Sequence, residues 1–151
     1  MAIGEICNRD VVFAPGETSA RGAAELMRGH HVGTVVVVND TSPDRRVPLG
    51  IVTDRDLVVA IVAKGLDPES IRLDALMAPD LLTVRETDGI AETIERMRTK
   101  GTRRMPVVDA SGALLGIVTA DDLIDLLAEE LTGLARMMAR EQKREAEVRK
   151  G

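Results

Sequence analysis

Residues 50–57 read GIVTDRDL and residues 116–123 read GIVTADDL, with six of the eight positions identical. The two phrases stand 66 positions apart in a chain of 151 residues. A chain of this length forms one ordinary domain or two very small units that share a core. Because self-similarity at a fixed spacing is typical of repeat architectures, the phrase predicts a fold built from two repeats of one unit.

The similarity extends upstream and predicts the elements of each repeat. Val37 and Val38 match Val107 and Val108 at an offset of 70. The first repeat carries four more residues between its last two strands, in a polar stretch that we expect to be an exposed loop. A short apolar strand precedes one amphipathic helix in each repeat, and each helix has apolar residues spaced i, i+4, i+7: Ala20, Ala24 and Met27, then Ile90, Ile94 and Met97. Each repeat therefore reads strand, helix, strand, strand, helix.

One repeat alone has a sheet face that it cannot cover. Pairing the repeats about a pseudo-twofold axis buries both faces, so we expect an α/β (α+β) fold in which two β-α-β-β-α motifs pack through their sheets. The expected divisions are 1–66 for the first motif, 67–130 for the second and 131–151 for a helical extension. The two motifs together are expected to form one module.

The composition excludes several classes of protein. Apolar residues make up 44% and charged residues 30%, as in soluble globular proteins. The net charge of −5 argues against a nucleic-acid binder, and the single aromatic residue, Phe13, provides no platform for stacked bases. The longest apolar run, residues 57–63, is too short to span a membrane. With one cysteine, Cys7, and no signal-peptide pattern, we expect a cytoplasmic protein without membrane or nucleic-acid partners.

The repeated phrase ends a buried strand and begins a helix with Thr-x-x-Asp, as Thr53 and Asp56 and again as Thr119 and Asp122. This pattern is typical of a capping box, with the threonine on a free backbone N–H and the acid at the positive helix end. The same turn also suits a ligand. Free N–H groups attract an anion, the hydroxyl contacts a phosphate or a sugar, and a carboxylate accepts both hydroxyls of a ribose. From the residues alone, both interpretations stay open.

The chain resembles a known family over about residues 3–130. The phrases GIVTDRD and GIVTADD, the segment RRMPVVD and the helix-ending Met27 and Met97 are similar to a tandem pair of cystathionine-β-synthase (CBS) motifs, also called a Bateman module. The resemblance implies binding of adenosine ligands such as AMP, ADP, ATP or S-adenosylmethionine. It implies contacts to phosphate and ribose from Thr53 and Asp56 in one site, and from Thr119 and Asp122 in the other.

Further site residues follow from the same resemblance. Arg103 and Arg104 occupy places from which basic residues reach phosphates in nucleotide-sensing members, and the alternative is a solvated pair at a turn. The first repeat has Gly33 and Thr34 there, so the Arg-bearing cleft is expected to suit a phosphorylated ligand better. Weaker candidates for ligand contact precede the first helix of each repeat, with helix capping as the alternative: Thr18 and Thr87.

No catalytic residue or metal site is predicted. The adjacent His30 and His31 do not face the same way on a helix, and no third histidine or nearby cysteine completes a ligand set. No phosphate-binding glycine loop or nucleophile–base arrangement stands out. We therefore expect a protein that is not an enzyme and has no tightly bound cofactor, with an adenine nucleotide or S-adenosylmethionine as its ligand.

The C-terminal segment predicts a long helix, because only one glycine and no proline interrupt residues 120–148. Its apolar stripe consists of Leu123, Leu127, Leu131, Leu134 and Met138. The segment reads as a solvated extension, a dimer arm or a docking helix for a protein partner. Because modules of the family it resembles usually associate as flat dimers, we expect a homodimer.

Two functions are consistent with these residues. The first is a regulatory module that binds an adenosine ligand between its halves and acts as a sensor. The second is a ligand-free dimerising scaffold or accessory subunit, in which the Thr-x-x-Asp turns serve only as helix caps.

Overall fold

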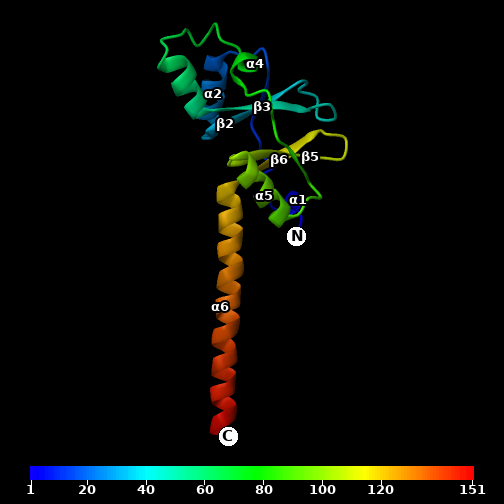
Figure 1. The fold of residues 1–151 in the computed structure, drawn as a ribbon, viewed down its shortest axis with the longest axis vertical. Helices are drawn as coiled ribbons and strands as arrows, with labels where there is room; N and C mark the ends of the chain where they lie inside the picture. Colours follow the sequence, from blue (N-terminus) through cyan, green and yellow to red (C-terminus); the bar gives the residue numbers. More distant parts are fainter.

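The computed structural model describes residues 1–151 and contains two three-stranded sheets and a long C-terminal helix (Figure 1). The first repeat forms β1 (Phe13–Pro15), α2 (Ala20–His30), β2 (Thr34–Val38), β3 (Pro48–Thr53), α3 (Asp54–Leu57) and a π-helical turn, η1 (Val58–Val62). The second forms β4 (Val84–Arg85), α5 (Ile90–Lys100), β5 (Arg104–Val108), β6 (Leu114–Thr119) and α6 (Ala120–Lys150). Two single-turn helices complete the chain: α1 (Ile3–Ile6) and α4 (Leu73–Leu76).

The two sheets share one topology, which confirms the predicted repeat and fold class. In each, the first strand is parallel to the second and the second is antiparallel to the third. Val37 pairs with Gly50 and Val107 pairs with Gly116, and a register shift follows each pair. The four extra residues of the first repeat therefore lie in the hairpin beyond the shift, as the offsets of 70 and 66 predicted.

Alternate residues of β2 pack into two different hydrophobic cores. Val35 and Val37 face α2 and α4, in a cluster with Met27 and Leu73. Val36 and Val38 face the opposite sheet, in a cluster with Leu114. Because successive strand residues point to opposite faces, an uninterrupted valine run fits a strand buried on both sides. The two motifs thus pack through their sheets, as predicted.

The predicted apolar face of α2 is wrong at one position. Ala24 is exposed and Ala23 is fully buried in its place. The equivalent residue of α5 is Thr93, also fully buried, whose hydroxyl donates to the Gly89 carbonyl at 2.8 Å. A threonine that satisfies its hydroxyl within the helix packs like an apolar residue, so the apolar pattern alone did not include this position.

The longer hairpin of the first repeat contacts the other sheet, although most of its residues are exposed as predicted. Within its own sheet, the Arg46 guanidinium lies 3.6 Å from the centroid of the Phe13 ring of β1. The Arg46 carbonyl accepts a hydrogen bond of 2.6 Å from the Leu114 N–H. The insertion therefore helps to hold the two sheets together.

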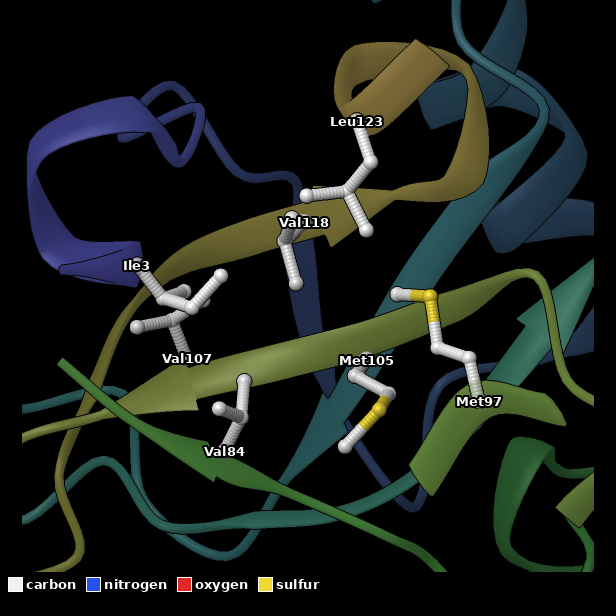
Figure 2. Close-up of a cluster of buried hydrophobic side chains, with 7 residues drawn as sticks. All are labelled: Ile3, Val84, Met97, Met105, Val107, Val118 and Leu123. Carbon is white, nitrogen blue, oxygen red and sulfur yellow. The ribbon is translucent and has the colours of Figure 1, made fainter. Parts of the chain in front are cut away.

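Each one-turn helix packs on the other repeat. Helix α1 precedes the first repeat but contacts the second, and α4 precedes the second repeat but contacts the first. Ile3 and Gly4 donate backbone hydrogen bonds to Asp88 and Glu86 of the second repeat, at 2.9 and 2.8 Å. Figure 2 shows Ile3 reaching from α1 to Val107 within the core of that repeat.

The connector repeats the pattern on the first motif. Leu73 and Asp74 of α4 donate to Thr18 and Gly16, at 2.9 and 3.0 Å. The predicted division between residues 66 and 67 stays a prediction. It divides the chain by sequence order, whereas in space α1 packs on the second motif and α4 packs on the first.

The glycine of each repeated phrase makes room for these crossings. A Cβ at Gly116 would lie 2.5 Å from the Asn8 carbonyl oxygen, and a Cβ at Gly50 would lie 2.6 Å from the Met77 sulfur. Asn8 follows α1 and Met77 follows α4, so both glycines are required by the same packing.

None of the helices has the combination of length and apolarity that crossing a membrane requires. Instead, α6 extends far from both sheets as a single arm, and the C-terminus lies at its far end (Figure 1).

Gly116→Ala is expected to lower the free energy of unfolding by about 1–3 kcal/mol, because the new methyl group meets fixed backbone. Gly29→Ala, on a helical surface with no neighbour within 4 Å of the added Cβ, should raise it by about 0.5–1 kcal/mol. Urea unfolding followed by far-ultraviolet circular dichroism measures both, since the chain has no tryptophan. Equal stability of the two variants would contradict the proposed role of the crossing.

Candidate functional site

Both Thr-x-x-Asp turns form complete capping boxes. The Thr53 hydroxyl accepts from the Asp56 N–H at 3.3 Å, and the Asp56 carboxylate accepts from the Thr53 N–H at 2.8 Å. At Thr119 and Asp122 the same distances are 3.2 and 3.1 Å. All of these side chains are half-buried. The capping interpretation is therefore confirmed for both turns.

Capping leaves part of each turn available for other contacts. Each aspartate uses only Oδ2 in the box, and its Oδ1 accepts no hydrogen bond within the chain. Each threonine hydroxyl accepts one bond and keeps its own proton to donate. A side chain that caps a helix can thus also face a ligand, so the two interpretations do not exclude each other.

A cleft of about 180 Å³ opens beside one of these turns. Both repeats and the connector contribute to it. Ile51 and Thr53 come from β3 of the first repeat, and Lys100, Thr102 and Arg104 come from the end of α5 and the start of β5. The connector supplies the remaining wall: Ala78, Asp80, Leu81 and Leu82.

The charges in this cleft come from three side chains. Lys100 forms an ion pair with Asp80 of the connector. The hydrogen bond from the Lys100 ammonium lowers the pKa of the Asp80 carboxyl below its ordinary value. Arg104 is half-buried and forms no ion pair within the chain, so the lining carries one cation that no carboxylate offsets.

The two predicted arginines lie in different places. Arg104 lines the cleft together with Thr53 of the other repeat. Arg103 is exposed and donates to Asp121 Oδ1 at 3.1 Å, outside the cleft. Adjacent residues at the start of a strand point to opposite faces, and this alternation separates the pair. The alternative of a solvated residue at a turn therefore fits Arg103, whereas Arg104 lines the cleft.

The remaining phrase residues do not line this cleft. Thr119 is the strand partner of Arg104, and paired residues of an antiparallel ladder point to the same face. Asp56 lies one helical turn after Thr53, held in the capping box. Ligand contacts from Asp56, Thr119 and Asp122 stay predictions.

Thr18 and Thr87 precede α2 and α5 but do not cap them. The N-cap residues are Ser19, whose hydroxyl accepts from the Gly22 N–H at 3.0 Å, and Gly89. The capping alternative for Thr18 and Thr87 is therefore wrong, and neither threonine lines the cleft. Thr18 instead accepts, through its backbone carbonyl, the hydrogen bond from Leu73 that anchors α4.

Lys100, Thr102 and Asp80 are cleft residues that the sequence did not indicate. Lys100 and Thr102 lie within four residues of Arg104, so the basic segment before β5 was a signal for them. No signal pointed to Asp80, because its place depends on the path of the connector across the second repeat.

The described structure contains no group of three or more histidine, cysteine, aspartate or glutamate side chains placed to hold a metal ion. Cys7 is half-buried, and burial raises the pKa of its thiol. The cleft itself is lined by hydroxyl, ammonium, guanidinium and carboxylate groups and by apolar side chains.

Comparison with known families decides what kind of module this is. The model of the CBS domain matches the chain twice, over residues 3–63 and residues 73–129. The chain belongs to the CBS domain family. Its two repeats are two CBS motifs in tandem, which confirms the resemblance seen in the sequence.

Two curated relatives and two solved structures illustrate the range of similarity. An uncharacterised protein of Methanopyrus kandleri is 36% identical over 126 residues, which cover 83% of this chain and 62% of that protein. Hypoxic response protein 1 of Mycobacterium tuberculosis is 32% identical over 125 residues, covering 83% of this chain and 84% of the relative. A crystal structure of hypoxic response protein I with two coordinated zinc ions matches with a TM-score of 0.70 at 29% identity, over 83% of this chain and 98% of that one.

A further solved structure is that of a CBS domain protein of Pyrobaculum aerophilum in complex with AMP. It matches with a TM-score of 0.71 at 27% identity, over 81% of this chain and 89% of that chain. The solved structures thus share the fold of residues that make up most of this chain, and the M. kandleri protein is longer than the part matched here.

Thr119→Ala should lower the free energy of unfolding by about 1 kcal/mol, because it removes the cap of α6 without touching the cleft. Thr119→Ser keeps the hydroxyl and should retain most of that stability. Thermal unfolding of the two variants beside the wild type measures the difference. Equal losses for Ala and Ser would show that the methyl group, rather than the cap, stabilises this turn.

Proposed function

We propose that this CBS pair is a non-catalytic sensor that binds an adenosine ligand in the cleft between its two motifs. The observation that carries the proposal is the convergence of Thr53 from one motif with Lys100 and Arg104 from the other. The complex of the P. aerophilum relative with AMP supports the ligand class. Because the site is built from both motifs, a ligand that contacts both of them affects how the two motifs are arranged.

Each part of the cleft suits a part of such a ligand. Arg104 and Lys100 offer charged donors to a phosphate. Ile51 and Leu81 offer apolar surface to the flat base. The Thr53 hydroxyl suits a ribose hydroxyl, and the Asp56 carboxylate, one helical turn further on and outside the cleft lining, is a further candidate for the same sugar.

The small size of the cleft favours a ligand that changes the structure when it binds. Its volume of about 180 Å³ is below the roughly 300–1,000 Å³ typical of small-molecule sites. A nucleotide therefore needs the connector wall to move, and the Lys100–Asp80 pair has to exchange a carboxylate partner for a phosphate. A ligand that binds only the opened arrangement shifts the population toward it.

The charges also favour one class of adenosine ligand. A phosphorylated ligand exchanges its anionic oxygens for Asp80 at Lys100 and adds a partner for Arg104. The cationic sulfonium of S-adenosylmethionine finds a guanidinium and an ammonium instead. AMP, ADP or ATP is therefore the proposed ligand in this cleft.

Thermal unfolding with AMP, ADP, ATP, S-adenosylmethionine and GTP tests the proposal. A ligand at 100 times its dissociation constant should stabilise the fold by about 2.7 kcal/mol, seen as a rise of several degrees. Arg104→Gln should reduce that rise. Arg103→Gln is the matched control, since it removes the same charge one residue away and outside the cleft.

The outcomes separate the two candidate functions. An adenine-selective rise that Arg104→Gln weakens and Arg103→Gln leaves intact supports the sensor. The absence of any shift with all five compounds would favour the scaffold, in which the Thr-x-x-Asp turns act as caps alone. Turnover of ATP by the wild type would contradict a non-catalytic role.

We further propose that the working unit is a cytoplasmic homodimer whose ligand state is read by a protein partner. Apolar grooves lie between α2 and η1 and between α5 and α6, with volumes of about 370 and 400 Å³. Val62 and Leu66 in the first groove are 71% and 44% exposed, and exposed apolar side chains grouped in this way favour a protein contact.

A further inference from the structure

The chain returns from the first motif to the second along a segment that no backbone–backbone hydrogen bond fixes. Residues 78–83 neither donate nor accept one. Before this segment, Met77 packs over Gly50, and after it β4 begins. Residues 78–82, which we call the connector wall, form one side of the cleft. Their position in the structure therefore depends on side chains.

The corresponding segment of the first motif is fixed by the backbone at both ends. It comprises residues 8–13, which stand 70 positions earlier in the chain. Asn8 exchanges two backbone hydrogen bonds with Ile117 on the outer edge of β6, each of 2.9 Å. The Val12 carbonyl accepts a hydrogen bond of 2.9 Å from the Val36 N–H. The two segments thus hold equivalent places but not equivalent bonds.

The sequence accounts for the missing bond at one end. The residue that corresponds to Val36 is Pro106, which has no N–H to donate to the Leu82 carbonyl. At the other end, no backbone bridge joins Ala78 to Ile51 of β3. The connector wall therefore has no backbone tie to either sheet.

Two side chains of α5 hold this segment instead. Lys100 pairs with Asp80, and both side chains are exposed, at 39% and 65%. Arg96 is less exposed, at 32%; it donates to the Thr83 carbonyl at 2.7 Å and pairs with Asp88 at 3.3 Å. An exposed ion pair is weak, whereas a half-buried charged donor with two acceptors is a stronger tie. The segment is therefore held firmly at Thr83 and lightly at Asp80.

We propose that the connector wall is a gate for the nucleotide, hinged where Arg96 holds Thr83 and kept closed by the Lys100–Asp80 pair. This inference rests on the proposed function and names the part that moves. The phosphate replaces Asp80 at Lys100, and the wall then moves outward to enlarge the cleft. Arg96 does not line the cleft, so it is a positioning residue that keeps the end of the wall in place while the rest opens.

The same comparison of the two halves indicates that only one of them opens. The place around Thr119 that corresponds to the cleft is bordered by residues 8–13, which the backbone ties at both ends. The position of Lys100 is occupied there by His30, and the position of Arg104 by a threonine. That half therefore lacks both a movable wall and the permanent cations, and the chain is expected to bind one nucleotide.

Spin labels test the gate without any nucleotide. In a Cys7→Ser background, a nitroxide on Ala78→Cys reports on the connector wall, and one on Asn8→Cys reports on its counterpart; both positions are exposed. Asp80→Asn should increase the mobility of the Ala78→Cys label, because the ion pair is lost. Asp10→Asn, the matched change 70 positions earlier, should leave the Asn8→Cys label unchanged. An Ala78→Cys label that Asp80→Asn does not free overturns the gate.

Calorimetric titration with AMP and ATP tests the single site. The wild type should bind one nucleotide per chain. Asp80→Asn should tighten binding roughly twofold to fivefold, because the phosphate no longer competes with a carboxylate for Lys100. Asp10→Asn should leave the affinity unchanged. Two equal sites per chain, or weaker binding by Asp80→Asn, contradict the proposal.

Arg96→Gln tests the hinge. It should also free the Ala78→Cys label but weaken nucleotide binding roughly threefold or more, because the ligand then has to order the wall. Arg96→Lys keeps a charged donor and should recover part of the affinity. Arg98→Gln is the matched control, since Arg98 lies on the same helix and pairs only with Glu95. An Arg96→Gln variant that melts earlier but binds nucleotide as the wild type does would show a structural role alone.

Failure of the gate and failure of the proposed function give different results. Nucleotide binding together with a label that stays fixed in Asp80→Asn overturns the gate and leaves the sensor standing. A label that is freed in a protein that binds no nucleotide overturns the proposed function, while it supports a wall held closed by the Lys100–Asp80 pair.

Discussion

In each half of the molecule a turn packs directly over a glycine of a strand: the Asn8 backbone lies over Gly116, and the Met77 side chain lies over Gly50. These crossings hold α1 and α4 against the motif opposite in chain order, where Ile3 and Leu73 fill the two outer cores. The shared inner core lies on the opposite face of each sheet, where Val36 and Val38 of one motif pack with Leu114 of the other. The repetition of the phrase therefore has a packing cause, because each copy supplies the glycine that such a close approach requires.

The cleft follows from the same arrangement. Once α4 is held on the first motif, the chain has to return across the second motif to reach β4, and this return segment supplies Asp80, Leu81 and Leu82. The cleft is therefore lined by the link between the repeats as much as by the repeats themselves. A change in the relative position of the two motifs moves that wall, and the proposed ligand would act on the module through this movement.

Much of this fold was predictable because its information is local and periodic. The valine runs, the helix spacings and the Thr-x-x-Asp caps each depend on neighbours within one element. The exchange of α1 and α4 was not predictable, because a helix of four residues contains too few positions to indicate its packing partner. In the candidate site, Arg104 was predicted from the family resemblance and lines the cleft, but its separation from Arg103 depended on the strand register. Thr93 was missed because a satisfied hydroxyl has no apolar signature.

The exchange of leading turns also sets an order of assembly during synthesis. The first motif lacks Leu73 until the connector has left the ribosome, and Ile3 has no place to pack until β4, β5 and β6 exist. The residues made first are therefore among the last to be fixed. Neither motif can be completed from its own stretch of chain, so the nascent polypeptide carries two half-finished cores until nearly all of both repeats has emerged. The unit of folding is the pair, even though the unit of sequence is the single motif.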